Sequence, residues 1–174
     1  MRFIDPHIHC VSRTTDDYVY MSRCGVVAVS EPAFWAGFDR STASSFADYF
    51  RHLMNVEPMR AARYGIDHCE EHTLRMAREN GFWAGLTIYP VSKVTPQRAA
   101  DIIETFGANM LCVNSASDWG ESGPSYLTDT CREFLSRGHT EAEATDIFYN
   151  NPCRFFGQSP KWKLKPIAPA APAA

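Results

Sequence analysis

Residues 82–115, FWAGLTIYPVSKVTPQRAADIIETFGANMLCVNS, decide the fold class. The apolar runs at 82–90 and 109–115 are typical of buried strands. Between them, Thr95 is suited to cap a helix at its start, and Gly107 is suited to end it. A strand, a helix and a second strand in this order predict two parallel strands joined by a helical crossover.

The same alternation extends to both sides of this unit. Further strands are predicted at 2–5, at 26–30 and near 66–69, and the β-branched run at 26–30 is typical of a strand buried on both faces. The remaining helices are predicted at 14–25, from about 44, at 70–81, at 124–137 and at 140–150. We therefore expect an α/β fold with a parallel sheet of about five strands and flanking helices.

Length and composition limit the domain organisation. The chain has 174 residues, of which 45% are hydrophobic, so it can bury one core. A closed (β/α)8 barrel typically needs ~250 residues. We expect one domain over residues 1–160, followed by a Pro/Ala-rich tail at 161–174 that is expected to be disordered.

Charge and apolar patterning restrict the partners. The formal net charge is -3 and no dense Lys/Arg run occurs, so the sequence carries no strong nucleic-acid footprint. No apolar run approaches the roughly 18 residues that span a bilayer, and the N-terminus lacks the apolar region of a secretory signal. Six cysteines without a CxxC pair indicate reduced thiols rather than a disulfide framework. A cytoplasmic protein without a membrane partner is expected.

Two histidines stand one residue apart after the first predicted strand. In an extended segment His7 and His9 point to the same face. Two neighbouring imidazoles can hold one metal ion, and they can equally be two incidental surface histidines. The residues at the other predicted strand ends are needed to choose between a metal site and incidental surface histidines.

Polar side chains follow the other predicted strands as well. They are Glu31, Asp67, His68, Glu70, Glu71, His72, Asn114, Ser115, Asp118 and Trp119. Imidazole and carboxylate together suit Zn²⁺, Mn²⁺, Fe²⁺ or Ni²⁺, and a carboxylate such as Asp118 can take a proton from a metal-activated water. The structural alternatives are a helix cap for His68, a loop cap for Asp118 and a plain loop residue for Glu31.

Four segments together resemble the TatD-like metal-dependent hydrolases of the amidohydrolase superfamily. The segments are FIDPHIH (3–9), DHCEEH (67–72), NSASDWG (114–120) and NNPCRFF (150–156). The family has a TIM-barrel fold, with an HxH pair after the first strand, a His after the sixth and an Asp after the eighth. The order of the motifs in this chain agrees with that pattern.

The resemblance implies roles for individual residues. His7, His9 and Asp118 would bind one divalent ion (Zn, Mn, Fe, Ni or Mg), and His68 would contribute to a second. Asp118 would also act on the nucleophilic water, and His72 is the competitor for the role of His68. The implied reaction is hydrolysis, with a small molecule or a phosphodiester as substrate.

The chain departs from the family in its middle. The resemblance covers residues 1–65 and 66–160, with an apparent junction near 65–66 where the third to fifth barrel strands are missing. Those strands would carry the bridging acid and a further His. Glu31 or Glu70 are possible substitute ligands.

Loss of these strands leaves three structural outcomes open. Two chains could complete each other as a homodimer that covers the open sheet edges, the strands could close into a smaller irregular sheet, or the shortened chain could fold poorly. The function expected is metal-dependent hydrolysis. The alternative is a non-catalytic remnant that binds one metal ion or none and acts, if at all, through self-association.

Overall fold

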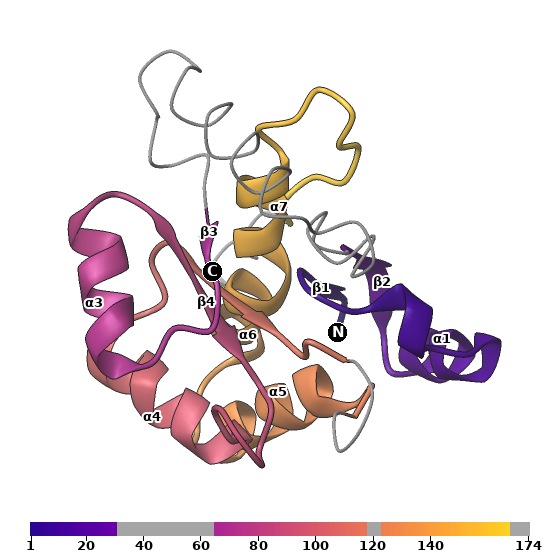
Figure 1. The fold of residues 1–174 in the computed structure, drawn as a ribbon, viewed down its shortest axis with the longest axis horizontal. Coiled ribbons are helices and arrows are strands. Elements are labelled where there is room, and N and C mark those ends of the chain that lie inside the picture. The colour runs from indigo at the N-terminus through magenta and orange to yellow at the C-terminus, as the bar shows by residue number, and fades with distance from the viewer. Residues whose placement is uncertain (31–64, 118–122, 168–174) are drawn as a thin grey trace, which may run out of the picture.

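The computed structural model describes residues 1–30, 65–117 and 123–167. Its strands are β1 (Phe3–Asp5), β2 (Val26–Val29), β3 (Gly65–Ile66), β4 (Trp83–Thr87) and β5 (Leu111–Asn114). β1 pairs with β2, and β3, β4 and β5 form a second sheet in that order. Every one of these pairings is parallel, which confirms the α/β class with parallel strands (Figure 1).

The two sheets meet beyond the carboxyl ends of β1 and β5. Ile8 and Ser117 form an isolated parallel bridge, and the backbone N–H of His9 donates to the carbonyl of Ser117 at 2.9 Å. The amide of Ser115 also donates to Asp5 Oδ1 at 3.1 Å. Across the fold, the strands therefore follow the order β2, β1, β5, β4, β3.

Helices connect and cover these strands. They are the 3₁₀ turn η1 (Cys10–Ser12), α1 (Thr15–Arg23), α3 (Glu71–Glu79), α4 (Pro96–Phe106), α5 (Tyr126–Ser136), α6 (Glu141–Thr145), the π turn η4 (Asp146–Asn150) and α7 (Asn151–Phe156). Thr14 caps α1 in a capping box with Asp17, and Thr95 caps α4 by accepting from the Arg98 amide. Among the described helices, none has the length and apolar character needed to cross a membrane.

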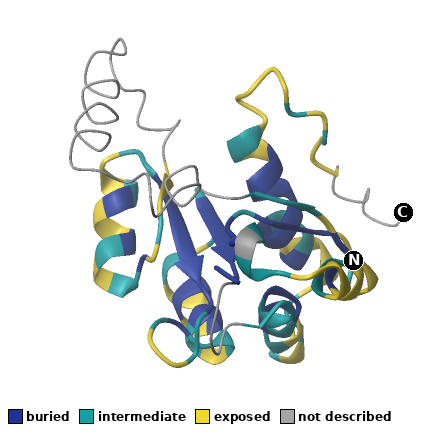
Figure 2. Cartoon of the chain, turned by 45° about the vertical axis from the view of Figure 1, so that its right-hand side comes forward, coloured by how far each residue is buried: buried dark blue, intermediate teal, exposed yellow. Residues whose placement is uncertain are grey.

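The core lies between the three-stranded sheet and its helices. Leu74, Leu86, Ile102, Leu127 and Phe148 are buried there, with β4 and β5 dark blue and the outer helix faces exposed in Figure 2. This arrangement buries the apolar face of each helix against the sheet, which is the main source of stability in such layers.

The prediction that the strand at 26–30 is buried on both faces is wrong. Val26 is 7% exposed, whereas Val27 is 43% exposed. Val29, in the same row of side chains as Val27, is partly buried and packs against the core, so the outer side of β2 is covered only in part. A β-branched run shows strand propensity but does not show what covers each face.

Three sequence predictions fall outside the described residues. They concern the helix expected from about 44, and the side chains of Glu31 and Asp118. Part of the C-terminal tail is described. Trp162 stacks on Phe156 with ring centroids 5.1 Å apart, and the Ile167 amide donates to Asn150 Oδ1 at 2.7 Å.

Candidate metal centre

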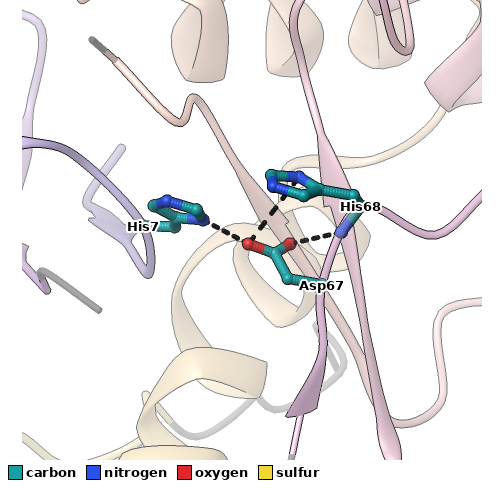
Figure 3. Close-up of side chains that lie close together, drawn as sticks. All are labelled: His7, Asp67 and His68. Carbon is teal, nitrogen blue, oxygen red and sulfur yellow. Dashed lines mark hydrogen bonds and ion pairs between the residues drawn. The ribbon is translucent and has the colours of Figure 1, made fainter. Parts of the chain in front are cut away.

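His7, Asp67 and His68 come together beyond the carboxyl ends of β1 and β3 (Figure 3). Each offers one ligand atom, and these three atoms lie within 4.8 Å of one another. The side chain of His7 is 7% exposed, that of Asp67 33% and that of His68 45%. The group therefore has one buried wall and one side open to solvent.

Asp67 is held by hydrogen bonds from several elements. Its Oδ1 accepts from Thr87 Oγ1 at 3.0 Å, from Asn114 Nδ2 at 2.9 Å and from the His68 amide at 2.8 Å. Its Oδ2 is paired with His7 Nδ1. Burial raises the pKa of Asp67, but the hydrogen bond from His7 and the charges of His7 and His68 outweigh it and hold the pKa well below its usual range. Asp67 is therefore a carboxylate at neutral pH.

Gly85 in the middle of β4 makes room for this carboxylate. A Cβ atom at position 85 would lie 2.4 Å from Asp67 Oδ1 and 3.2 Å from Asp67 Cα. Glycine inside a strand often marks such a close approach. The position of Asp67 thus requires a glycine, which has no side chain, at position 85 of the neighbouring strand.

His68 has an unusual backbone conformation. Its φ is 57°, in the left-handed region that non-glycine residues seldom adopt. In this conformation its Nδ1 lies 2.7 Å from Thr87 Oγ1 and its ring centroid 5.5 Å from that of His7. Residues held in such conformations are concentrated at functional sites.

His9 lies next to His7, as the HxH spacing predicts. The two Nε2 atoms are 3.1 Å apart, and the rings meet edge to face with centroids separated by 4.8 Å. His9 is buried, but its ligand atoms are not part of the close group formed by His7, Asp67 and His68. His9 faces the Nε2 atom of His7, whereas Asp67 faces the other ring nitrogen of His7, Nδ1.

Asp5 supports the backbone beneath the site. It is buried, and its Oδ1 accepts from the amides of His7 at 3.3 Å and Ser115 at 3.1 Å. Burial raises the pKa of Asp5 to about 6, against the opposing effect of the hydrogen bonds from Ser115 and His7. Asp5 thus ties the end of β1 to the end of β5.

Glu70, the possible substitute ligand, is placed elsewhere. Its Oε2 accepts from Arg98 Nη2 at 2.8 Å, and Glu70 stands at the N-terminus of α3. It is not in the close group with His7 and His68. Because Asp118 and Glu31 lie outside the described residues, the structure leaves their assigned roles as predictions.

In the sequence alone, Asp67 stands among the strand-end residues without an assigned role, and Thr87 has none either. Two signals point to Asp67: it stands between the last apolar strand residue and His68, and Gly85 interrupts the apolar run of residues 82–86. Asn114 carried the same kind of signal as the last residue of β5. All three belong to one hydrogen-bonded network.

A cavity of about 340 Å³ opens beside the metal-ligating group. His7, Asp67 and His68 line it together with the rings of Trp83, Phe155 and Phe156. Pockets of this size bind small molecules. The candidate centre therefore has a space beside it that can admit a ligand.

The donor set fits a divalent metal. Two imidazoles and one carboxylate match the ligands preferred by Zn²⁺, Mn²⁺, Fe²⁺ and Ni²⁺. Catalytic zinc sites likewise have three protein ligands and leave a further coordination position to water or substrate.

Comparisons of the chain with protein-family models, with curated proteins and with solved structures yield no match.

Proposed function

We propose that this protein is a metal-dependent hydrolase whose divalent ion is held by His7, Asp67 and His68. The observation that carries the proposal is the convergence of His7 with Asp67, 60 residues away in sequence, and with the adjacent His68, at strand ends beside a cavity. In parallel α/β folds, functional groups collect at the carboxyl ends of strands.

The strand order supports a relation to an incomplete TIM barrel. In a closed barrel the first strand lies between the second strand and the last one. Here β1 pairs with β2 on one side and is bridged to the extension of β5 on the other. Together with the TatD-like motifs, this order favours a barrel segment from which intermediate strands are missing.

Each side chain of the proposed site has a different role. A divalent ion supplies Lewis-acid chemistry, which polarises an ester oxygen and lowers the pKa of bound water. His7 and His68 offer ring nitrogens, and Asp67 offers an ionised carboxylate that Thr87 and Asn114 hold in place. We assign the role of general base to Asp118, which follows β5 in the sequence.

Hydrolysis of para-nitrophenyl acetate and bis(para-nitrophenyl) phosphate tests this proposal. Activity should disappear with a chelator, return on addition of Zn²⁺ or Mn²⁺, and fall at least about a hundredfold in His7→Ala and His68→Ala, because each removes a ligand. His139→Ala is the matched control, since His139 stacks on Phe134 outside the site. Hydrolysis that survives both chelation and His7→Ala would contradict the proposal.

A folded protein that binds zinc and hydrolyses neither ester would favour the alternative function, a non-catalytic metal-binding remnant. Asp118→Asn separates the two within the same assay. It should abolish turnover while zinc remains bound by His7, Asp67 and His68. Unchanged turnover would remove Asp118 from the mechanism.

A further inference from the structure

The wall of the cavity beyond the metal-ligating group is aromatic. The rings of Trp83 and Phe155 lie with centroids 5.6 Å apart at 55°, and those of Phe155 and Phe156 lie 5.0 Å apart at 67°. Phe155 reaches over Gly65 of β3, where a Cβ would be 3.4 Å from its Cζ. Rings meeting at such angles leave faces and edges against which another aromatic ring can pack.

The same wall lacks positive charge. Among the described residues that line the cavity, none is Lys or Arg. Arg154 neighbours Phe155 in sequence, but its guanidinium donates to Asp146 Oδ1 at 2.6 Å and to Asn151 Oδ1 at 2.7 Å. Sites that bind phosphoryl groups usually place Arg or Lys beside them to balance their charge. Without a metal ion, this cavity is therefore poorly suited to a polyanionic ligand.

The volume favours a small molecule with a ring. A cavity of about 150 Å³ is enough for benzene, so the 340 Å³ observed here leaves room for one ring and a short ester group. Because His7 and Asp67 line the same space as Trp83 and Phe155, one ligand can reach both the metal-ligating group and the aromatic wall.

We infer that the cavity binds an uncharged aromatic ester, with the ring against Trp83, Phe155 and Phe156 and the acyl group toward His7, Asp67 and His68. This inference rests on the proposed hydrolase function and narrows its substrate class. In the reaction, the oxygen of water adds to the acyl carbon and the bond from that carbon to the aryl oxygen breaks. The departing phenoxide takes up one proton of the attacking water, so the products are a phenol and a carboxylic acid.

Binding of acetanilide, the unreactive amide counterpart of phenyl acetate, tests the inference without requiring turnover. Titrations followed by calorimetry or ligand-observed NMR would use the full chain, first metal-free and then loaded with zinc. We expect acetanilide to bind both forms, and to bind the metal-free form more tightly than phenyl phosphate does. Absence of acetanilide binding, or phenyl phosphate binding the metal-free protein equally well, would overturn the inference.

Phe155→Leu tests the aromatic wall while it keeps an apolar side chain in place. It should weaken acetanilide binding about three- to tenfold, the range expected for loss of one aromatic contact. Phe106→Leu is the matched control, because Phe106 ends α4 and does not line this cavity. Equal binding by Phe155→Leu and the wild type would overturn the inference. If Phe155→Leu does not fold, the comparison of acetanilide with phenyl phosphate in the wild type still tests the inferred substrate class.

Zinc binding measured in the same titrations keeps the two proposals apart. A protein that binds zinc through His7 and His68 but not acetanilide retains the proposed function and loses the inferred substrate class. A protein that binds acetanilide but no zinc loses the proposed function, and the inferred reaction is lost with it.

Discussion

Asp67 connects the two sheets at the level of single residues. Its Oδ2 pairs with His7 after β1, while its Oδ1 accepts from Thr87 in β4 and Asn114 in β5. The sequence shows each of these residues at or near a strand end, but it does not show which of them meet. Asp67 and His7 are 60 residues apart, and their pairing depends on the packing of β1 against β5.

Replacement of His68 should weaken zinc binding more than replacement of His9. His68 belongs to the close group of ligand atoms, whereas the ring nitrogens of His9 lie outside that group and its Nε2 faces the Nε2 of His7. We expect His68→Ala to raise the zinc dissociation constant more than about a hundredfold and His9→Ala to raise it by about ten- to a hundredfold, as for a supporting residue. Competition with a chromogenic chelator measures both. A larger effect of His9→Ala would instead place the ion between His7 and His9.

Gly85→Ala should disturb both stability and zinc binding. The added Cβ would lie 2.4 Å from Asp67 Oδ1, so the carboxylate or the strand must move. A loss of about 1–3 kcal/mol in the free energy of unfolding is expected for such overpacking. Gly65→Ala is the control, because its Cβ would meet Phe155 at an ordinary 3.4 Å. Urea unfolding and zinc affinity that are identical for the two variants would refute a specific role for Gly85.

At the level of helices and strands, the ends marked by local chemistry were predictable. The Thr95 cap and the terminal Gly107 define α4 in both the sequence and the structure. The burial of β2 was not predictable, because the exposure of Val27 depends on which other parts of the chain pack against it, and the sequence of β2 alone does not identify them. Local signals set where elements begin and end, and tertiary packing sets which of their faces are covered.

Thr95→Ala should destabilise the protein by about 1 kcal/mol through loss of the α4 cap. Thr95 Oγ1 accepts from the Arg98 amide at 3.1 Å, and alanine cannot replace that bond. Thr95→Ser keeps the hydroxyl group and should remain within a few tenths of a kcal/mol of the wild type. Chemical denaturation of the three proteins provides the measurement. Equal losses in both variants would mean that the methyl group, and not the cap, stabilises the helix.

Arg98 links α4 to α3 and makes stability depend on pH. Its hydrogen bonds hold the pKa of Glu71 below its usual value, so this pair stabilises the folded state above the unfolded pKa of about 4.3 and loses that effect as pH falls through the folded pKa. Since both side chains are partly exposed, Arg98→Gln should cost less than about 1 kcal/mol at pH 7. The difference from wild type should shrink toward pH 3. Unfolding curves that differ equally at both pH values would contradict this.

For the whole molecule, the candidate centre joins the sheet of β1 and β2 to the sheet of β3, β4 and β5. The alternation of strands and helices predicted the parallel pairing within each sheet. The sequence also indicated that histidines and carboxylates gather at strand ends. It did not indicate that Asp67 would complete a group with His7 and His68, because that group exists only once the two sheets meet.

The content of zinc per chain tests the central claim most directly. The untagged protein would be stripped with a chelator, loaded with excess Zn²⁺, dialysed and measured by elemental analysis beside His7→Ala and the control His139→Ala. We predict about one zinc ion per chain in the wild type and in His139→Ala, and almost none in folded His7→Ala, because a three-ligand site that loses one ligand binds zinc far more weakly. Equal zinc content in the wild type and His7→Ala, or no zinc in either, would contradict the assignment of His7, Asp67 and His68 as a metal centre.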